Sequence, residues 1–322
     1  MRLACVILLA CSVQAADLRI GIIGADTSHA TAFTKLLNVD NIGEGAKVVA
    51  AVKGGSPDVE ASRSRIERFT TELQSKYNVE IVPDIKTLLT KVDAVLLLGV
   101  DGRVHLAQAR EVFVSKKPVF IDKPLAASLA DAREIARAAR EAGAPWFSSS
   151  SLRFGKIAES LRTPDNRGAM VWGPGPTEEH HSLQLTWYGI HSVELLYTLM
   201  GPGCESVSMH VEQGSDVLVG KWSDGRLGTI RLQRPYGPFG AVVFTDKEAK
   251  QSQATDDVGY APLITKVVEF FRTRRAPVTE AETMEIFEFM DAAQRSKAQG
   301  GAPAQRVLRT TTPAANAASI KP

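Results

Sequence analysis

The first half of the chain alternates short apolar runs with segments in which apolar residues recur at helical spacing. The runs predict buried strands at 20–23, 47–52, 79–82, 94–100, 118–121 and 146–150. Helical segments follow at 28–37, 59–77, 85–90, 106–115 and 129–142. Buried strands that alternate with helices are typical of a doubly wound parallel sheet. We therefore predict an α/β Rossmann domain over residues 16–150.

The pattern changes after about residue 150, where a Gly-, Pro- and Asn-containing segment, 162–176, predicts a loop. Strands are expected at 206–211, 216–222, 226–232 and 241–245, and helices at 190–200, 262–273 and 279–296. Ser223-Asp224-Gly225 is a hairpin signal between two of these strands. This order predicts an α+β domain with a mainly antiparallel open sheet over residues 151–308. The Ala-, Thr- and Pro-rich residues 309–322 are expected to be disordered.

The N-terminus has the pattern of an export signal. Arg2 precedes an apolar run, and Val13-Gln14-Ala15 offers small residues at the cleavage positions. We expect residues 1–15 to be a signal peptide and the protein to be exported, to the periplasm or outside the cell. The alternative is a lipoprotein signal in which Cys11 is lipidated. Without the leader only Cys204 is left, which excludes a disulfide framework and a cysteine-based metal site.

The composition of the chain limits the classes of binding partner that we expect. The formal net charge is +2, and the apolar share of 44% is ordinary for a globular protein. This balance gives no reason to expect nucleic acid or a membrane surface as partner. No apolar run after the leader is long enough to span a bilayer.

The turn after the first strand resembles an incomplete dinucleotide fingerprint. The pattern Gly-x-Gly-x-x-Gly requires glycine at 24, 26 and 29, but only Gly24 is present, and Asp26 and His29 stand at the other two positions. Thr27 or Ser28 can cap the following helix. The positive end of that helix would face a pyrophosphate, although Asp26 would place a carboxylate where phosphate approaches.

The end of the second strand bears on the choice of cofactor. An acidic residue there binds the ribose of NAD, but this chain has Lys53, followed by Ser56. A lysine and a serine can accept the 2′-phosphate of NADP, and the alternative is a solvated turn. The expected cofactor is therefore NAD or NADP.

The order of elements and four local motifs resemble the glucose–fructose oxidoreductase / inositol dehydrogenase / rhizopine catabolism (Gfo/Idh/MocA) family. The resemblance covers nearly all of the chain after the leader. The motifs are the Gly24 turn, the turn from Val100 to His105, Asp122-Lys123-Pro124, and Gly189-Ile190-His191 with Glu194. The resemblance implies that Gly24, Val100, His105 and Asp122 contact the cofactor, together with the positions around Asp26 to His29 and Lys53.

The third motif is usually Glu-Lys-Pro in that family, and its lysine lies between nicotinamide and the reacting hydroxyl. The resemblance assigns that role to Lys123, with Asp122 as a shorter acid in place of glutamate. An ammonium there stabilises a developing alkoxide. The alternative is a surface turn lysine.

The fourth motif, Asp-x-Gly-x-His-x-x-Asp in the family, begins here with Trp187. His191 matches the acid–base histidine and Glu194 replaces the second aspartate. An indole accepts no proton, but Trp187 can stack on a sugar face, and Tyr188 follows it. A histidine that opens a helix is otherwise often structural.

Two further positions complete the expected substrate site. Arg153 resembles the family's Arg-Phe and is expected to orient substrate or support a domain seam, and His181 is expected at the pocket rim. The spacing of His180, His181 and their acidic neighbours matches no metal pattern, so we expect no metal.

These residues predict an NAD(P)-dependent oxidoreductase that moves a hydride to or from a carbohydrate or cyclitol hydroxyl. The alternative is an exported sugar-binding, lyase-like or hydrolase-like relative without redox turnover, which Asp26 and Trp187 favour. A homo-oligomer, dimer or tetramer, is implied by the resemblance.

Overall fold

The computed structural model describes residues 17–254, 256 and 259–307, so the predicted leader with Cys11 and the predicted tail lie outside it. The chain forms two compact units. Unit 1 contains residues up to 125, 135–148 and 259–277. Unit 2 contains residues 126–134, 149–258 and those from 278 onward.

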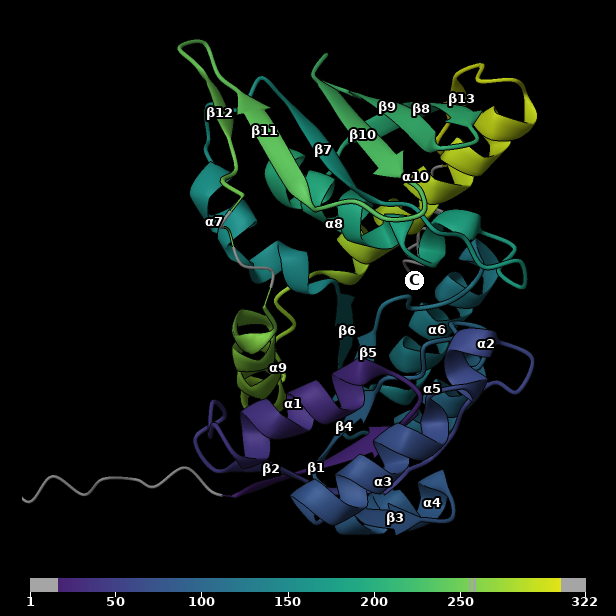
Figure 1. Cartoon of the computed structure of the whole chain (residues 1–322), viewed down its shortest axis with the longest axis vertical. Coiled ribbons are helices and arrows are strands. Elements are labelled where there is room, and N and C mark those ends of the chain that lie inside the picture. The colour runs from purple at the N-terminus through teal and green to yellow at the C-terminus, as the bar shows by residue number, and fades with distance from the viewer. Residues whose placement is uncertain (1–16, 255, 257–258, 308–322) are drawn as a thin grey trace, which may run out of the picture. The chain divides into compact units, whose positions relative to one another are not determined.

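Unit 1 is built on a six-stranded sheet with the order β3-β2-β1-β4-β5-β6 (Figure 1). From β3 to β5, each strand pairs in parallel with its neighbour. The strands are β1 (Leu18–Ile23), β2 (Ala46–Val52), β3 (Glu80–Val82), β4 (Ala94–Leu97), β5 (Val119–Asp122) and β6 (Trp146–Ser149). The doubly wound parallel sheet predicted from the sequence is confirmed.

Helices connect these strands. They are α1 (Ser28–Asn38), α2 (Glu60–Arg63), α3 (Ile66–Tyr77), α4 (Ile85–Lys91), α5 (His105–Val114), α6 (Leu129–Ala142) and, from later in the chain, α9 (Ala261–Thr273). α1 contacts α3 and α9, and α4 contacts α5 (Figure 1). α9 belongs to unit 1, where Phe270 packs edge-on against Phe147 of β6 at 4.9 Å.

The middle of this sheet is apolar and fully buried. Ala51 of β2 pairs with Ile22 of β1, Ile22 with Leu96 of β4, and Leu96 with Phe120 of β5. All four side chains are inaccessible to solvent. Burial of such a row is the main stabilising term for the sheet, and it fixes the positions of the turns that follow the strands.

Unit 2 is built on a seven-stranded sheet with the order β12-β11-β7-β10-β9-β8-β13 (Figure 1). Only the pairing of β7 with β10 is parallel. The strands are β7 (Gly168–Pro174), β8 (Cys204–Glu212), β9 (Ser215–Trp222), β10 (Leu227–Gln233), β11 (Gly240–Phe244), β12 (Ala249–Gln251) and β13 (Ala304–Gln305). The predicted α+β region with a mainly antiparallel sheet is confirmed.

Helices cover one face of this second sheet. α8 contacts β7 and β10, and α10 contacts β8. The helical segments are η1 (Ser151–Phe154), α7 (Lys156–Leu161), η2 (Gln184–Thr186), α8 (Gly189–Met200) and α10 (Glu280–Ala298). A buried row of Ala241, Val171, Ile230, Leu218 and Met209 crosses five strands.

Two sequence predictions about local structure were wrong. The predicted loop 162–176 contains the interior strand β7, whose short apolar run lies between Gly168 and Pro174. Pairing with β10 and β11, which are distant in the sequence, stabilises this strand despite its glycine and proline residues. The predicted helix 59–77 is broken between α2 and α3 at Ser64 and Arg65.

Candidate functional site: the turn after β1 and the start of α8

Gly24 allows the ends of β1 and β4 to approach closely. Its φ is +94°, and a Cβ there would lie 2.4 Å from the backbone nitrogen of Gly99. Gly54, with φ +63°, packs against Gly24 from the end of β2. In an open α/β sheet, ligands bind outside the carboxyl ends of the strands where the strand order reverses. That point lies between β1 and β4, so the glycines lie at the expected ligand site.

The N-terminus of α1 has backbone donors that fit a phosphate. Thr27 is the N-cap, and its hydroxyl accepts a hydrogen bond from the backbone N–H of His29 at 3.3 Å. Within residues 17–254, 256 and 259–307, no hydrogen bond joins the backbone N–H groups of residues 26, 27 and 28 to another group. Consecutive N–H groups at the positive end of an eleven-residue helix suit an anion.

Asp26 is turned into the protein. It is 1% exposed; one carboxylate oxygen accepts from the Ser62 hydroxyl at 2.6 Å, and the other from the Val100 N–H at 3.1 Å. Ser62 also accepts from the backbone N–H of Ser56 at 2.8 Å. One buried carboxylate therefore ties together the loops after β1, β2 and β4. Its charge still lies beside the end of α1 and opposes a phosphate there.

His29, at the position of the third fingerprint glycine, binds the end of β5. Its Nδ1 lies 2.5 Å from Asp122, and its ring stacks on Phe33 and meets the edge of Tyr260. Burial acts to raise the pKa of Asp122, but His29 and Lys123 outweigh it, so the pKa lies below its ordinary value. His29 and Asp122 therefore form a buried pair beside Lys123. The second Asp122 oxygen, Oδ1, is buried without a protein partner among the described residues.

Lys123 follows directly after β5 and is half-buried. Burial lowers the pKa of its ammonium group, and Arg65 lowers it further, although Asp122 opposes both effects. A lysine with a lowered pKa at the carboxyl end of a strand releases its proton more readily than an ordinary lysine, which suits a group that takes part in proton transfer.

His105 and Lys53 have partners inside unit 1. His105 is fully buried, with Nε2 2.8 Å from the Gly99 carbonyl and Nδ1 3.3 Å from the Leu125 carbonyl, and burial lowers its pKa. It therefore fastens the end of β4 to the turn after β5. Lys53 forms an ion pair with Glu67 at the surface.

In unit 2, His191 lies in the first turn of α8. Its Nδ1 lies 2.8 Å from the hydroxyl of Ser150, and its ring lies 5.6 Å from the rings of both Tyr188 and Phe239. Tyr188 in turn meets Tyr236, which is 64% exposed. His191 is thus surrounded by aromatic rings, which are suitable surfaces for the apolar faces of sugars.

Arg153 and Glu194 bind each other rather than solvent. Arg153 Nε donates to Glu194 at 2.8 Å, and Nη1 donates to Glu282 of α10 at 2.5 Å. Arg153 and Glu194 are buried. Burial raises the pKa of Glu194 even though Arg153 opposes the rise. The three residues join η1, α8 and α10, so the structure gives Arg153 and Glu194 a clear structural role.

The remaining predicted residues lie in the segment before α8. Buried His181 has Nδ1 2.9 Å from the Thr186 hydroxyl, and its ring meets the half-buried Trp187 edge-on at 5.3 Å. His180 pairs with Glu178 at 2.5 Å. In the described part of the chain, no group of three His, Cys, Asp or Glu residues could hold a metal. Burial raises the pKa of Cys204 to about 12, as expected for a packed thiol.

Sequence reasoning missed several of these neighbours. Tyr236 and Phe239 stand in a short Pro- and Gly-containing connection before β11, and Ser150 ends a predicted strand. The sequence feature that could have indicated these neighbours is the presence of two aromatic residues in a connection otherwise rich in residues that end helices and strands. Lys123 lies in unit 1 and His191 in unit 2.

Comparison with known proteins shows which family the N-terminal part of the chain resembles. Residues 18–149 match the model of the GFO_IDH_MocA family, described as an oxidoreductase family with an NAD-binding Rossmann fold. This part of the chain is similar to the Gfo/Idh/MocA oxidoreductase family. The resemblance inferred from the motifs is confirmed, and NAD is the cofactor in the family's description. No curated protein sequence matches the chain.

Solved structures share the whole fold. GenD2 from gentamicin A biosynthesis, solved with NAD, is 17% identical with a TM-score of 0.75, and the match covers 91% of this chain and 97% of GenD2. A probable dehydrogenase from Thermotoga maritima is 21% identical, with a TM-score of 0.72 and coverage of 89% and 98%. The myo-inositol dehydrogenase of Lactobacillus casei, solved with NAD(H) and myo-inositol, is 17% identical, with a TM-score of 0.70 and coverage of 91% and 98%. At these identities the likeness establishes the fold. Among the described residues, no helix has the length and hydropathy to cross a membrane.

Proposed function

We propose that the protein is an NAD-dependent dehydrogenase that moves a hydride between nicotinamide and a hydroxyl group of a carbohydrate or cyclitol. The observation that carries the proposal is Lys123, an ammonium group with a lowered pKa at the carboxyl end of β5 in an NAD-binding family domain. The relatives solved with NAD, and one solved with myo-inositol, support the same reaction class.

The α1 end would hold the dinucleotide. The N–H groups of residues 26–28 would bind the pyrophosphate, and Gly24 would let it approach the backbone. Lys53 is paired with Glu67 rather than poised for a 2′-phosphate, which favours NAD over NADP. When bound, NAD supplies the hydride acceptor, and every other step is performed by side chains of the protein.

Lys123 would bind the substrate oxygen and stabilise its negative charge as the hydride leaves the adjacent carbon. His191 would accept the hydroxyl proton. The contact between the Ser150 hydroxyl and Nδ1 of the imidazole would orient the ring for this transfer. Tyr188 and Tyr236 would stack on the substrate ring, which favours a polyhydroxylated ring over a linear acid.

The test is a screen of the full-length protein with NAD and a panel of aldoses, sugar acids and inositols, followed by nicotinamide absorbance. We expect reduction of NAD with at least one ring polyol. Lys123→Met and His191→Asn should each lower kcat by about a hundred-fold or more while NAD still binds. Turnover that survives both substitutions would refute the assigned roles.

A binding or non-redox function is the second candidate, and Asp26 is the observation that favours it. A carboxylate at the second fingerprint glycine opposes the pyrophosphate. In that case the protein would bind the same sugars with unchanged affinity in the presence and absence of NAD, and no sugar would reduce NAD.

We also propose a homo-oligomer. The outer face of the second sheet carries the cross-strand row Val242, Met170, Thr229 and Val219, and Met170 is 43% exposed. An extended, partly apolar sheet face favours burial against a second copy. Sedimentation should show a dimer or tetramer that Met170→Glu dissociates; a monomeric wild type would contradict this.

Export is the proposed location, on the basis of the leader sequence. Cell fractionation with N-terminal sequencing should recover a mature chain that begins at Ala16. Retention of an acylated Cys11 would instead indicate the lipoprotein.

A further inference from the structure

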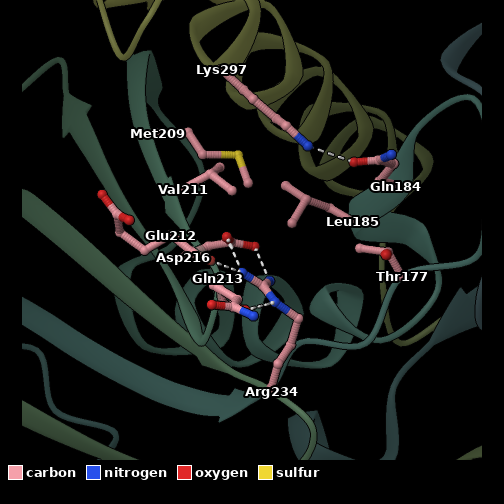
Figure 2. Close-up of a pocket in the computed structure, with 10 residues that line it drawn as sticks. All are labelled: Thr177, Gln184, Leu185, Met209, Val211, Glu212, Gln213, Asp216, Arg234 and Lys297. Carbon is pink, nitrogen blue, oxygen red and sulfur yellow. Dashed lines mark hydrogen bonds and ion pairs between the residues drawn. The ribbon is translucent and has the colours of Figure 1, made fainter.

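Unit 2 has a cavity of about 450 Å³ that the proposed reaction does not use (Figure 2). It lies among the ends of β8 and β9, the C-terminal half of α10 and the segment that contains η2. Neither His191 nor any of its aromatic neighbours lines it. The volume is in the range of small-molecule sites.

One side of the cavity is formed by an ion pair whose two charges cancel. Arg234 donates to the two carboxylate oxygens of Asp216 at 2.6 and 2.7 Å, and Asp216 is buried. A further Arg234 bond, 2.5 Å long, goes to the carbonyl of Glu212. The guanidinium is therefore held by the protein, and the pair adds little net charge to the cavity.

The other side carries a cation that has no acidic partner. Lys297 of α10 donates to the side-chain oxygen of Gln184 at 2.8 Å (Figure 2). No ion pair joins it to a carboxylate among the described residues. An ammonium group has three donors, and an amide oxygen uses one of them. A half-buried lysine held by a neutral side chain in a cavity can therefore bind an anionic group.

The walls between these two sides carry both apolar and polar side chains. Leu185, Met209 and Val211 give an apolar strip, and Thr177 and Gln213 add a hydroxyl and an amide. In Figure 2 the carboxylate of Glu212 lies at the outer edge and points away from Lys297. The apolar strip suits the hydrophobic face of a sugar ring, and the hydroxyl and amides suit its hydroxyl groups.

We propose that this cavity is a second ligand site, for a sugar acid of one or two rings whose carboxylate binds Lys297. A single cation matches a singly charged carboxylate. A phosphate would be a poorer match, because its greater charge favours several cationic or backbone donors. The apolar strip and the neutral amides bind the remainder of the molecule. The site would recognise a hydroxylated acid independently of NAD.

The experiment is calorimetric titration of the full-length protein with glucuronate, glucose and glucose 6-phosphate as probes. We expect one saturable glucuronate site per chain, with glucose weaker by about ten-fold or more. Lys297→Gln should lower glucuronate affinity by a similar factor. Val211→Trp should abolish binding by filling the cavity while it keeps the lysine.

Two control variants separate this site from the proposed active site. Lys221→Gln removes the same charge from an exposed position of β9, and His191→Ala alters the proposed active site. Glucuronate binding should be unchanged in both. The proposal is overturned by absence of saturable glucuronate binding, by loss in His191→Ala but not in Lys297→Gln, or by tighter binding of glucose 6-phosphate. None of these results depends on whether the protein turns over NAD.

Discussion

Replacement of Gly24 by alanine tests whether the turn after β1 is built for close backbone approach. The new Cβ would lie 2.4 Å from the nitrogen and 2.6 Å from the Cα of Gly99, and 3.3 Å from the carbonyl carbon of Leu98. These are backbone atoms of the segment after β4, so no side-chain rotation can relieve the clash. The alanine would also have to adopt a φ of +94°, which L-residues rarely do.

The expected cost combines both effects. A non-glycine residue in a sparsely populated backbone region costs about 1–3 kcal/mol, and overpacking in a tight site costs about 1–3 kcal/mol more. Gly24→Ala should therefore destabilise unit 1 by about 2–6 kcal/mol, a large part of the stability of an ordinary domain. If the turn moves instead, the N–H groups at the start of α1 move with it, and NAD affinity falls.

Gly143→Ala is the matched control. Gly143 also has a positive φ, +65°, but nothing lies within 4 Å of its Cβ position. This variant measures the cost of the positive φ alone, about 1–2 kcal/mol. Urea unfolding followed by circular dichroism, with hydrogen exchange of β1 and β4, gives the stabilities; calorimetry gives NAD affinity. Equal stability and equal NAD affinity of the two variants would refute the reasoning.

Three further substitutions test other parts of the site. Asp26→Asn removes a buried charge beside the proposed phosphate site and should tighten NAD binding by roughly five-fold, about 1 kcal/mol; unchanged or weaker calorimetric affinity would contradict this. Asp122→Asn removes the charge that raises the pKa of Lys123, so that pKa should fall further below its ordinary value. This pKa can be followed through the pH dependence of Lys123 acetylation, measured by mass spectrometry. An unchanged profile would show that the Asp122 carboxylate and the Lys123 ammonium group do not interact. Arg153→Met leaves Glu194 buried without its partner and should cost about 3–5 kcal/mol near neutral pH. Because the folded-state pKa of Glu194 is already raised, its protonated form favours folding below the unfolded-state pKa, and that contribution is lost as pH rises through the folded pKa. The loss in Arg153→Met should therefore shrink in mildly acidic urea titrations, and a loss independent of pH would count against this ion pair.

Local patterns were enough for most of the fold. The apolar run before Gly24 predicted β1, and alternation of strands and helices predicted the parallel sheet. β7 was missed because its few apolar residues lie between Gly168 and Pro174, and its stability comes from β10 and β11. Long-range pairing is invisible to a local pattern.

The site was predicted less completely, for the same reason. Asp26 and His29 were noticed because they replace glycines, but their partners Ser62 and Asp122 lie 36 and 93 residues further along the chain. Only the fold brings these side chains together. The aromatic surroundings of His191 likewise depend on Phe239, which belongs to a connection that no motif marked.

The central claim is that the end of α1 and the turns after β1 and β4 hold NAD. Calorimetric titration of NAD into the full-length protein tests it most directly. We predict saturable binding at one site per chain, weakened in Gly24→Ala and retained in Gly143→Ala. Absence of heat up to millimolar NAD, or equal binding by both variants, would contradict the account.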